Sequence, residues 1–367
     1  SAMFILSNIA YAEPNFDKKD ITAALLADYE TGDILYSYNI DNRIEIASIT
    51  KIMTYLVAMD EVTKGNAKLT DKVTISEHAA SRGGSSFKLK PGEVHTLGSL
   101  IESAMIVSAN DSCIAIAEHI SGSEKAFIKL MNEKAAEIGL EKSFYTSVNG
   151  YPEDGPHNQM STKDILKLSK YTIEHYPQII DTTKKDKLVD EVKGYEFANT
   201  NPLMGLVDGV YGLKTGYTDI AGYCLVSGVK MKPGISASDN VISIVMGAGN
   251  TKIRSDRSLS LIEIAKSKDY KKEKILDKNV SIDTISVGNT FKSSREVYPI
   301  HDVYGILKEG QDIDKEVIIY DYLQPPIKKG DVVGQITLKY GENEKIIDLT
   351  INKDIKNFDS LDSVDMV

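Results

Sequence analysis

The stretch EIASITKIMT, residues 45–54, combines a chemically useful pair of side chains with the start of a helix. Ser48 and Lys51 lie three positions apart, and from Ile49 onward apolar residues recur at the spacing of an amphipathic helix. Side chains at this spacing share one helical face, so the lysine amine can reach the serine hydroxyl. The alternative is a serine that caps the helix beside a solvated lysine, and the pair taken alone favours that interpretation.

The order of three short motifs decides between these alternatives. Ser48-x-x-Lys51 is followed by Ser108-x-Asn110, which separates two apolar-periodic segments, and then by Lys214-Thr215-Gly216, which occurs once, on an expected strand. Each motif alone has a structural explanation, but the three together in this order favour a catalytic one. Matches to the first two motifs that lack this context are Ser85–Lys88, Ser227–Lys230, Ser37–Asn39, Ser147–Asn149 and Ser238–Asn240.

The residue types in the first motif suit nucleophilic catalysis. A serine hydroxyl is a poor nucleophile until a neighbouring base takes its proton. Lys51 can act as that base only when it is neutral, and both burial and a second cation lower a lysine pKa. Lys214 could supply the second cation. The sequence therefore predicts Ser48 as the nucleophile and Lys51 as its base.

The other two motifs suit the handling of a substrate. The Ser108 hydroxyl could relay a proton to the leaving amine, and the Asn110 amide could hold a substrate backbone. Lys214 and Thr215 suit a terminal carboxylate, by charge and by hydroxyl donor. Gly216 lacks a side chain, so a substrate could lie against its strand as an added strand.

An oxyanion hole is the remaining requirement of such a site. Preorganised backbone N–H groups stabilise the charge that develops on a carbonyl oxygen under attack. The backbone N–H groups of Ser48 and Tyr217 are the natural candidates, because each lies beside a motif that carries the chemistry.

The expected elements are two strands around a turn within residues 23–39, a long helical insert, three strands near residues 210–250 and a closing helix from Arg254. This order predicts an α+β fold, with an antiparallel sheet flanked by helices and a mostly helical lobe beside it. Residues 13–268 are expected to form this catalytic domain. The charged stretch DYKKEKILDKN, residues 269–279, indicates a linker, and short alternating strands over residues 276–367 predict a small all-β, sandwich-like domain.

Composition excludes several functions. The chain has 367 residues, a formal net charge of −10 and a pI near 5.2, which argues against binding nucleic acid. Cys113 and Cys224 form no disulfide framework, and the six histidines show no zinc-ligand spacing, so neither a metal nor another cofactor is expected. No apolar run reaches the length of a membrane-spanning helix.

The N-terminus indicates export. Residues 4–12 resemble the tail of a secretory signal peptide, and Ala10-Tyr11-Ala12 has the small-x-small form of a cleavage site. Ser1-Ala2-Met3 resembles an expression-tag scar, so residues 1–12 are expected to be a scar and signal remnant. The alternative is a short apolar strand.

With the three motifs, the blocks DYETGDILY, GGSSFKLKPGE, SANDSCIAIAEHISGS and GLKTGYTDIAGYCLVSG resemble low-molecular-mass penicillin-binding proteins, the serine-type D-Ala-D-Ala carboxypeptidases. PIKKGDVVGQITL resembles the C-terminal β domain of that family. The resemblance implies a penicillin-binding/β-lactamase-like catalytic domain that acts through an acyl-enzyme on Ser48. It also implies removal of the terminal D-alanine from peptidoglycan stem peptides, inhibition by β-lactams, and a location that is secreted or at the outer face of the bacterial cytoplasmic membrane.

Two departures and two alternatives accompany the resemblance. SVNGYPEDGPHNQMST lacks the Asn-x-x-Gly-Leu form expected there, and the acidic end NFDSLDSVDMV differs from a basic amphipathic anchor, so membrane association is expected only through a segment outside this sequence. A β-lactamase is disfavoured because no Glu-x-x-Leu-Asn occurs between Asn110 and Lys214. A catalytically silent peptidoglycan-binding or penicillin-sensing module is disfavoured because every catalytic position is filled.

Overall fold

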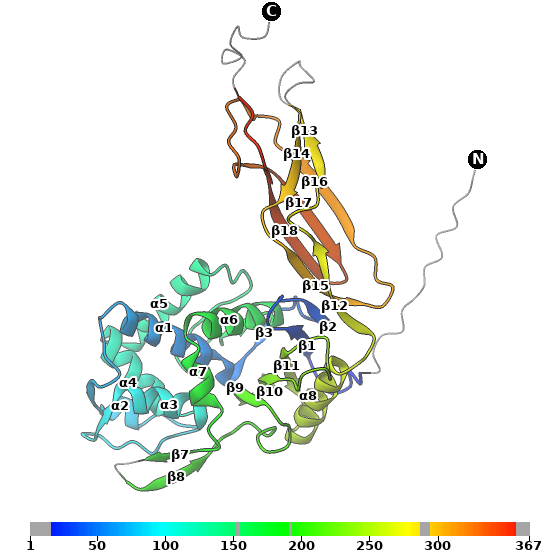
Figure 1. Ribbon diagram of the computed structural model, residues 1–367. Helices are drawn as coiled ribbons and strands as arrows, with labels where there is room; N and C mark the ends of the chain where they lie inside the picture. The colour runs from blue at the N-terminus through cyan, green and yellow to red at the C-terminus, as the bar shows by residue number, and fades with distance from the viewer. Residues whose placement is uncertain (1–15, 152–154, 191–192, 287–293, 357–367) are drawn as a thin grey trace, which may run out of the picture. The chain divides into compact units, whose positions relative to one another are not determined.

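The computed structural model describes residues 16–151, 155–190, 193–286 and 294–356 (Figure 1). These residues divide into two compact units. The first unit runs to Tyr29 and resumes over Leu35–Lys266, and the second combines Glu30–Ile34 with the described chain from Ser267 onward. The expected signal remnant, residues 1–12, lies outside the described residues.

A five-stranded antiparallel sheet in the order β2-β1-β11-β10-β9 forms the centre of the first unit. Every residue of β1 is buried, so both faces of the sheet are covered there, and helices α6 and α8 pack against it. The predicted antiparallel sheet flanked by helices is confirmed. The elements are β1 (Ala23–Asp28), β2 (Ile34–Tyr38), β9 (Val210–Thr218), β10 (Gly222–Lys230), β11 (Asn240–Ala248), α6 (Thr162–His175) and α8 (Thr251–Ala265).

The closing helix α8 begins earlier than predicted. The sequence placed its start at Arg254, whereas the helix starts at Thr251 because the Asn250 side chain accepts a hydrogen bond from the Ile253 backbone N–H. An asparagine at this position satisfies one of the free N–H groups of the first turn. The earlier start places Arg254 inside the helix.

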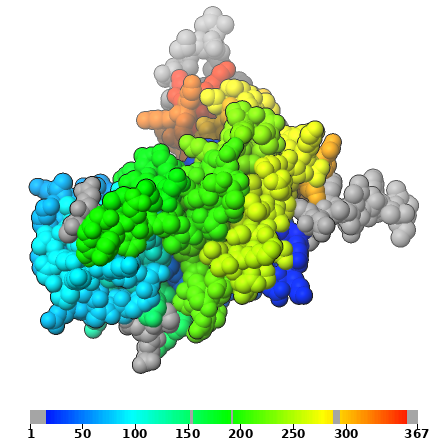
Figure 2. All heavy atoms as spheres, turned by 90° about the horizontal axis from the view of Figure 1, so that it is seen from below, coloured from blue at the N-terminus to red at the C-terminus, as the bar shows by residue number. Residues whose placement is uncertain are grey.

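The insert between β2 and β9 is mostly helical, as predicted. Helices α3 (Leu97–Ile106) and α4 (Asn110–Ser121) are the two apolar-periodic segments on either side of Ser108. The hairpin of β7 (Lys187–Asp190) and β8 (Tyr195–Ala198), which the sequence did not predict, lies over this lobe and contacts α3 (Figure 2). The other elements of the insert are β3 (Ile44–Glu45), η1 (Ala47–Thr50), α1 (Lys51–Thr63), β4 (Lys72–Thr74), α2 (Glu77–Ala80), β5 (Val94–Thr96), α5 (Glu124–Glu137), β6 (Gln159–Met160) and α7 (Gln178–Thr183).

The second unit consists of strands, as predicted for the C-terminal domain. One sheet has the order β13-β14-β18-β17-β16 and another pairs β12 with β15, around buried residues such as Val297, Ile336 and Leu349. The strands are β12 (Tyr270–Leu276), β13 (Asp283–Ile285), β14 (Arg295–Pro299), β15 (Val303–Lys308), β16 (Asp314–Ile319), β17 (Val332–Tyr340) and β18 (Asn343–Ile351).

Strand β12 occupies most of the stretch that was predicted to be a linker, so that prediction is wrong. Tyr270, Ile275 and Leu276 are buried, and the charged residues between them are exposed. A strand with this many charged side chains has the same composition as a solvated linker. Its pairing with β15 is what distinguishes it from a linker.

Two further observations hold for the described part of the chain. No helix there is long and apolar enough to cross a membrane, and no cluster of three or more His, Cys, Asp or Glu residues could hold a metal ion. Cys113 and Cys224 are both buried and free.

Candidate active site

Ser48 lies in the 3-10 turn η1, directly before helix α1, which Lys51 begins. In 3-10 geometry the side chains at positions i and i+3 eclipse one another. Lys51 Nζ and Ser48 Oγ are accordingly 2.6 Å apart, within hydrogen-bond distance. The sequence predicted the pairing of these two residues but not the tighter turn that brings them together.

Lys51 is completely buried, and two further groups hold its amine. Nζ donates to Asn110 Oδ1 at 2.8 Å and to the backbone carbonyl of Asn149 at 2.9 Å. Burial lowers the pKa of Lys51 to about 8, and Cys113 and Asp111 partly oppose this shift. The environment therefore shifts the equilibrium of this amine toward the neutral form that a base requires.

The Asn149 carbonyl is a contact that sequence reasoning missed. Ser147-x-Asn149 was set aside as a match in a loop, yet that loop contributes a backbone atom to the site. Gly150 has a φ of +73°, and a Cβ there would lie 1.9 Å from the Ala47 carbonyl oxygen, so no larger residue fits against the turn that carries Ser48. The Asn-Gly dipeptide was the available signal of such a turn.

Ser108 and Asn110 lie where α3 ends and α4 begins. Ser108 has a φ of +63°, a left-handed conformation that side-chain-bearing residues rarely adopt, and it lines the cavity beside Ser48. The Asn110 side chain is already engaged, because Oδ1 accepts from Lys51 and Nδ2 donates to the Gly83 carbonyl at 2.8 Å. The backbone N–H of Asn110 donates to the Ser85 carbonyl at 2.7 Å.

Lys214 and Thr215 lie on β9 at different depths. Lys214 is 1% exposed and donates to the Thr215 carbonyl at 2.9 Å. Burial and then the charge of Lys51 hold the pKa of Lys214 well below its usual value. Thr215, in contrast, lines the cavity, and its hydroxyl donates to the Thr200 hydroxyl at 2.7 Å.

Gly216 packs against η1, the turn that carries Ser48. A Cβ at Gly216 would lie 3.1 Å from the Ser48 backbone nitrogen and 3.2 Å from both Ala47 Cβ and the Ile46 carbonyl oxygen. The glycine therefore allows strand β9 to approach the turn, which adds a second reason for its identity to the one that the sequence suggested.

A cavity of about 410 Å³ opens above these residues. Its walls include Arg254, which sequence reasoning did not select. Arg254 is 8% exposed, its guanidinium lies 5.8 Å from the centroid of the Tyr223 ring, and its Nε has no hydrogen-bond partner among the described residues. The lining residues are Ser48, Gly84, Ser85, Ser108, Asn110, Gly150, Tyr151, Thr200, Thr215, Gly216, Tyr217, Tyr223 and Arg254.

The two other Ser-x-x-Lys pairs lack the geometry of a nucleophile with its base. Ser85 lines the cavity, but the amine of Lys88 lies over the Tyr195 ring, 5.5 Å from its centroid. Ser227 is buried in the middle of β10. Lys51 therefore stands apart from the other two lysines in its contact with a cavity-lining serine.

The sequence profile of D-alanyl-D-alanine carboxypeptidases matches residues 10–250. The chain belongs to that family. A second profile, for the C-terminal domain of penicillin-binding protein 5, matches residues 270–356 of this carboxypeptidase. The D-alanyl-D-alanine carboxypeptidase DacF of Bacillus subtilis is 34% identical over 328 residues, which cover 86% of this chain and 81% of that protein.

Solved structures agree with this assignment. Penicillin-binding protein 5 from Haemophilus influenzae has a TM-score of 0.78 at 26% identity, over 95% of this carboxypeptidase and 100% of that chain. Penicillin-binding protein D2 from Listeria monocytogenes, in its ampicillin-bound form, has a TM-score of 0.62 at 29% identity, over 70% and 100% of the two chains. The chain is therefore a serine-type D-Ala-D-Ala carboxypeptidase, which sets aside the β-lactamase and the silent module.

Proposed function

We propose that Ser48 attacks the carbonyl carbon of the penultimate D-alanine of a peptidoglycan stem peptide, with Lys51 as its base. The observation that carries this proposal is the 2.6 Å distance between Ser48 Oγ and the buried Lys51 amine. As the bond between Oγ and carbon forms, the neutral amine accepts the hydroxyl proton. Asn110 and the Asn149 carbonyl support this role because both hold Lys51 Nζ in place.

The backbone N–H groups of Ser48 and Tyr217 are proposed to stabilise the oxyanion. The close packing of Gly216 on the Ser48 nitrogen supports this pairing, because it brings β9 against the nucleophile turn. When the tetrahedral intermediate collapses, the bond between carbon and nitrogen breaks and the departing D-alanine takes a proton by way of the Ser108 hydroxyl. Water then hydrolyses the ester, which releases the shortened peptide and restores Ser48.

The terminal carboxylate of the peptide is proposed to dock on Thr215 and Arg254. Both line the cavity, and a guanidinium presents paired donors that match a carboxylate. Lys214 does not line the cavity. Its proposed role is therefore electrostatic: the charge of Lys51 lowers the pKa of Lys214, and the same repulsion would disfavour protonation of Lys51 while Lys214 is charged.

The same serine is proposed to react with β-lactams, as the ampicillin-bound form of the Listeria relative suggests. No Asp or Glu lines the cavity among the described residues, so no carboxylate there can activate water against a penicilloyl ester. Because peptidoglycan lies outside the cytoplasmic membrane, the enzyme is proposed to act there, either secreted or at the outer face.

The test combines turnover with mapping of the nucleophile. The protein should release free D-alanine from a pentapeptide that ends in D-Ala-D-Ala, and a penicillin adduct should map to the tryptic peptide that contains Ser48. A Ser48→Ala variant should lose both signals. An adduct on Ser85 or Ser227 would contradict the assignment.

A further inference from the structure

Residues 83–93, here called the strap, carry Gly84 and Ser85 into the wall of the cavity. The strap contains neither helix nor strand, so no ladder of backbone hydrogen bonds holds it. Lys88 within it has a φ of +57°, which side-chain-bearing residues seldom adopt. Backbone hydrogen bonds fix only parts of it, from the Asn110 N–H to the Ser85 carbonyl at 2.7 Å and between Ile75 and both Gly92 and Glu93. The stretch between these points depends on side chains that contact it from other elements.

Asp111 holds the inner side of the strap. This carboxylate is completely buried and accepts hydrogen bonds from Ser86 Oγ at 2.7 Å, Phe87 N at 3.0 Å and Leu89 N at 3.1 Å. Hydrogen bonds to an ionised group are among the stronger ones in proteins. The inner side is thus fixed from the start of α4, next to Asn110.

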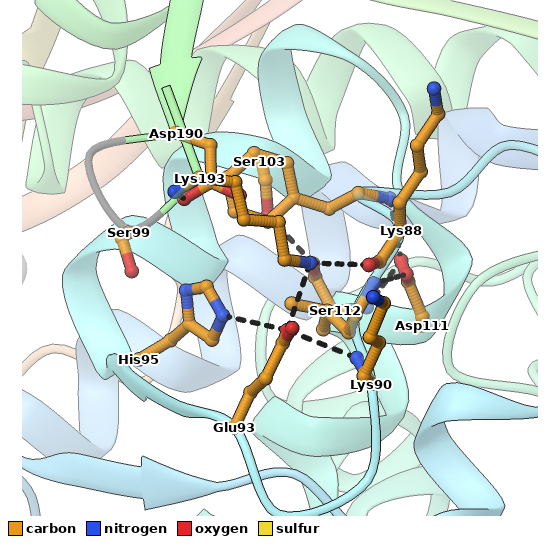
Figure 3. Close-up of polar contacts among 12 residues, drawn as sticks. Lys88, Lys90, Glu93, His95, Ser99, Ser103, Asp111, Ser112, Asp190 and Lys193 are labelled. Atoms are coloured by element: carbon orange, nitrogen blue, oxygen red, sulfur yellow. Dashed lines mark hydrogen bonds and ion pairs between the residues drawn. The ribbon is translucent and has the colours of Figure 1, made fainter. Parts of the chain in front are cut away.

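Lys193, from the β7–β8 hairpin, holds the outer side. Figure 3 shows its amine between the Glu93 carboxylate, at 2.8 Å, and the backbone carbonyl of Lys88. Glu93 Oε2 also accepts from the Lys90 N–H at 3.0 Å. The Lys193 side chain is only 12% exposed, so these contacts are largely protected from water.

An aromatic contact joins the same two elements. The Phe197 ring, on β8, lies 5.3 Å from the Phe87 ring of the strap, centroid to centroid. The Lys88 amine of the strap also lies over the Tyr195 and Phe197 rings of the hairpin, at 5.5 and 5.8 Å from their centroids. Among these contacts, the Lys193 amine bonds to the backbone of the strap.

We propose that Lys193 is a positioning residue for substrate binding. Through Glu93 and the Lys88 carbonyl it supports the outer side of the strap, which Asn110 holds at Gly83 and Ser85, and the strap in turn sets Gly84 and Ser85 at the edge of the cavity. This inference rests on the proposed function, in which the cavity receives the stem peptide. Ser48 and Lys51 belong to η1 and α1, and the Lys51 amine is held by Asn110 and the Asn149 carbonyl rather than by Lys193. Loss of Lys193 should therefore weaken binding and leave the chemistry nearly intact.

The test is a split between KM and kcat on the D-Ala-D-Ala pentapeptide. Lys193→Met should raise KM roughly fivefold, the effect of losing one partly buried charged contact, with kcat within about twofold of wild type. Lys193→Arg keeps the charge and the donors and should restore KM. Lys187→Met is the matched control, because Lys187 is an exposed lysine of the same hairpin that pairs with Glu196 and not with the strap.

A purely structural role predicts a different result. Partial unfolding lowers the fraction of enzyme that penicillin titrates, and hence the apparent kcat, but leaves KM unchanged. The rises in KM for Lys193→Met and Glu93→Ala should also fail to multiply in the double variant. The proposal would be overturned if KM is unchanged in Lys193→Met, or if KM rises equally in Lys187→Met. It would also be overturned if the KM rises of Lys193→Met and Glu93→Ala multiply fully in the double variant. Failure of the proposed function itself would appear separately, as wild-type protein that releases no D-alanine.

Discussion

Gly216 and Ser48 approach so closely that a Cβ on the glycine would lie 3.1 Å from the serine's backbone nitrogen. Few Cβ atoms in proteins have so close a neighbour, and here the neighbours are mostly backbone atoms that cannot rotate away. The proposed oxyanion hole and nucleophile therefore depend on the absence of a single methyl group.

Gly216→Ala should slow acylation by penicillin by about 10- to 100-fold, because the methyl group displaces the Ser48 N–H from the oxyanion position. Gly249→Ala is the control, since its Cβ would meet only ordinary contacts at 3.7 Å. The second-order labelling rate and the melting temperature should be measured for both variants. Equal rates for wild type and Gly216→Ala would refute the packing argument.

The pH dependence of acylation should report Lys51. Its pKa is lowered to about 8, so below pH 8 most of the amine is protonated and cannot accept a proton. The labelling rate should rise about tenfold per pH unit well below 8 and level off above it. Lys51→Arg should abolish labelling, because arginine stays protonated, whereas Lys88→Arg should not affect it. A rate that is flat from pH 5 to 9 would exclude Lys51 as the base.

Arg254 should account for recognition of the terminal carboxylate. Arg254→Ala and amidation of the substrate's C-terminus should each lower kcat/KM by about 10- to 100-fold, and the two losses should not multiply. Lys252→Ala, at an exposed position in the same helix, serves as the control. The losses from Arg254→Ala and from amidation could instead multiply fully, while those from Lys214→Ala and amidation do not. In that case Lys214, and not Arg254, would bind the terminal carboxylate.

The penicilloyl adduct should persist while the peptide acyl-enzyme turns over. Both esters are proposed to form on Ser48, but the peptide loses D-alanine and leaves space for water, whereas the opened β-lactam keeps its leaving group attached. Loss of bound penicillin label and release of D-alanine should be followed in the same preparation. If the label clears as fast as the peptide turns over, an unidentified group must activate the water.

Asp33 should stabilise the second unit. It is 1% exposed and accepts from the Ile306 N–H at 2.7 Å and the Tyr340 hydroxyl at 2.9 Å, with Lys345 Nζ at 2.8 Å. Asp33→Ala should lower that unit's free energy of unfolding by about 3 kcal/mol, measured by urea denaturation, because a partly buried cation loses its carboxylate and two donors lose their acceptor. Asp283→Ala, at an exposed position, should have little effect, and penicillin labelling should survive in both variants.

Much of the fold followed from the sequence, because its strongest patterns are local. The apolar periodicity around Ser108 predicted α3 and α4, and the turn within residues 23–39 predicted β1 and β2. The β7–β8 hairpin and β12 were missed for a common reason: their exposed, charged strands are stabilised by pairing with partners, and pairing leaves little trace in composition.

The candidate site divides in the same way. Ser48, Lys51 and Thr215 are visible in the sequence because their chemistry lies in the side chain and in a short motif. The Asn149 carbonyl is a backbone atom that every residue type supplies, so the Asn-Gly dipeptide could indicate the turn but not its contact with Lys51. Arg254 belongs to no motif, and only the packing of α8 on the sheet brings it to the cavity.

The make-up of the second unit also governs how its parts can be exchanged. Asp33 and Tyr340 are separated by 307 positions in the chain, yet they share one hydrogen bond inside this unit. A chimera that takes its C-terminal domain from a relative and is joined near Ser267 would combine that domain with an unrelated turn at residues 30–34. Such a graft should fold well only when the turn is transplanted with it, so the natural unit of exchange is two separate pieces of the chain.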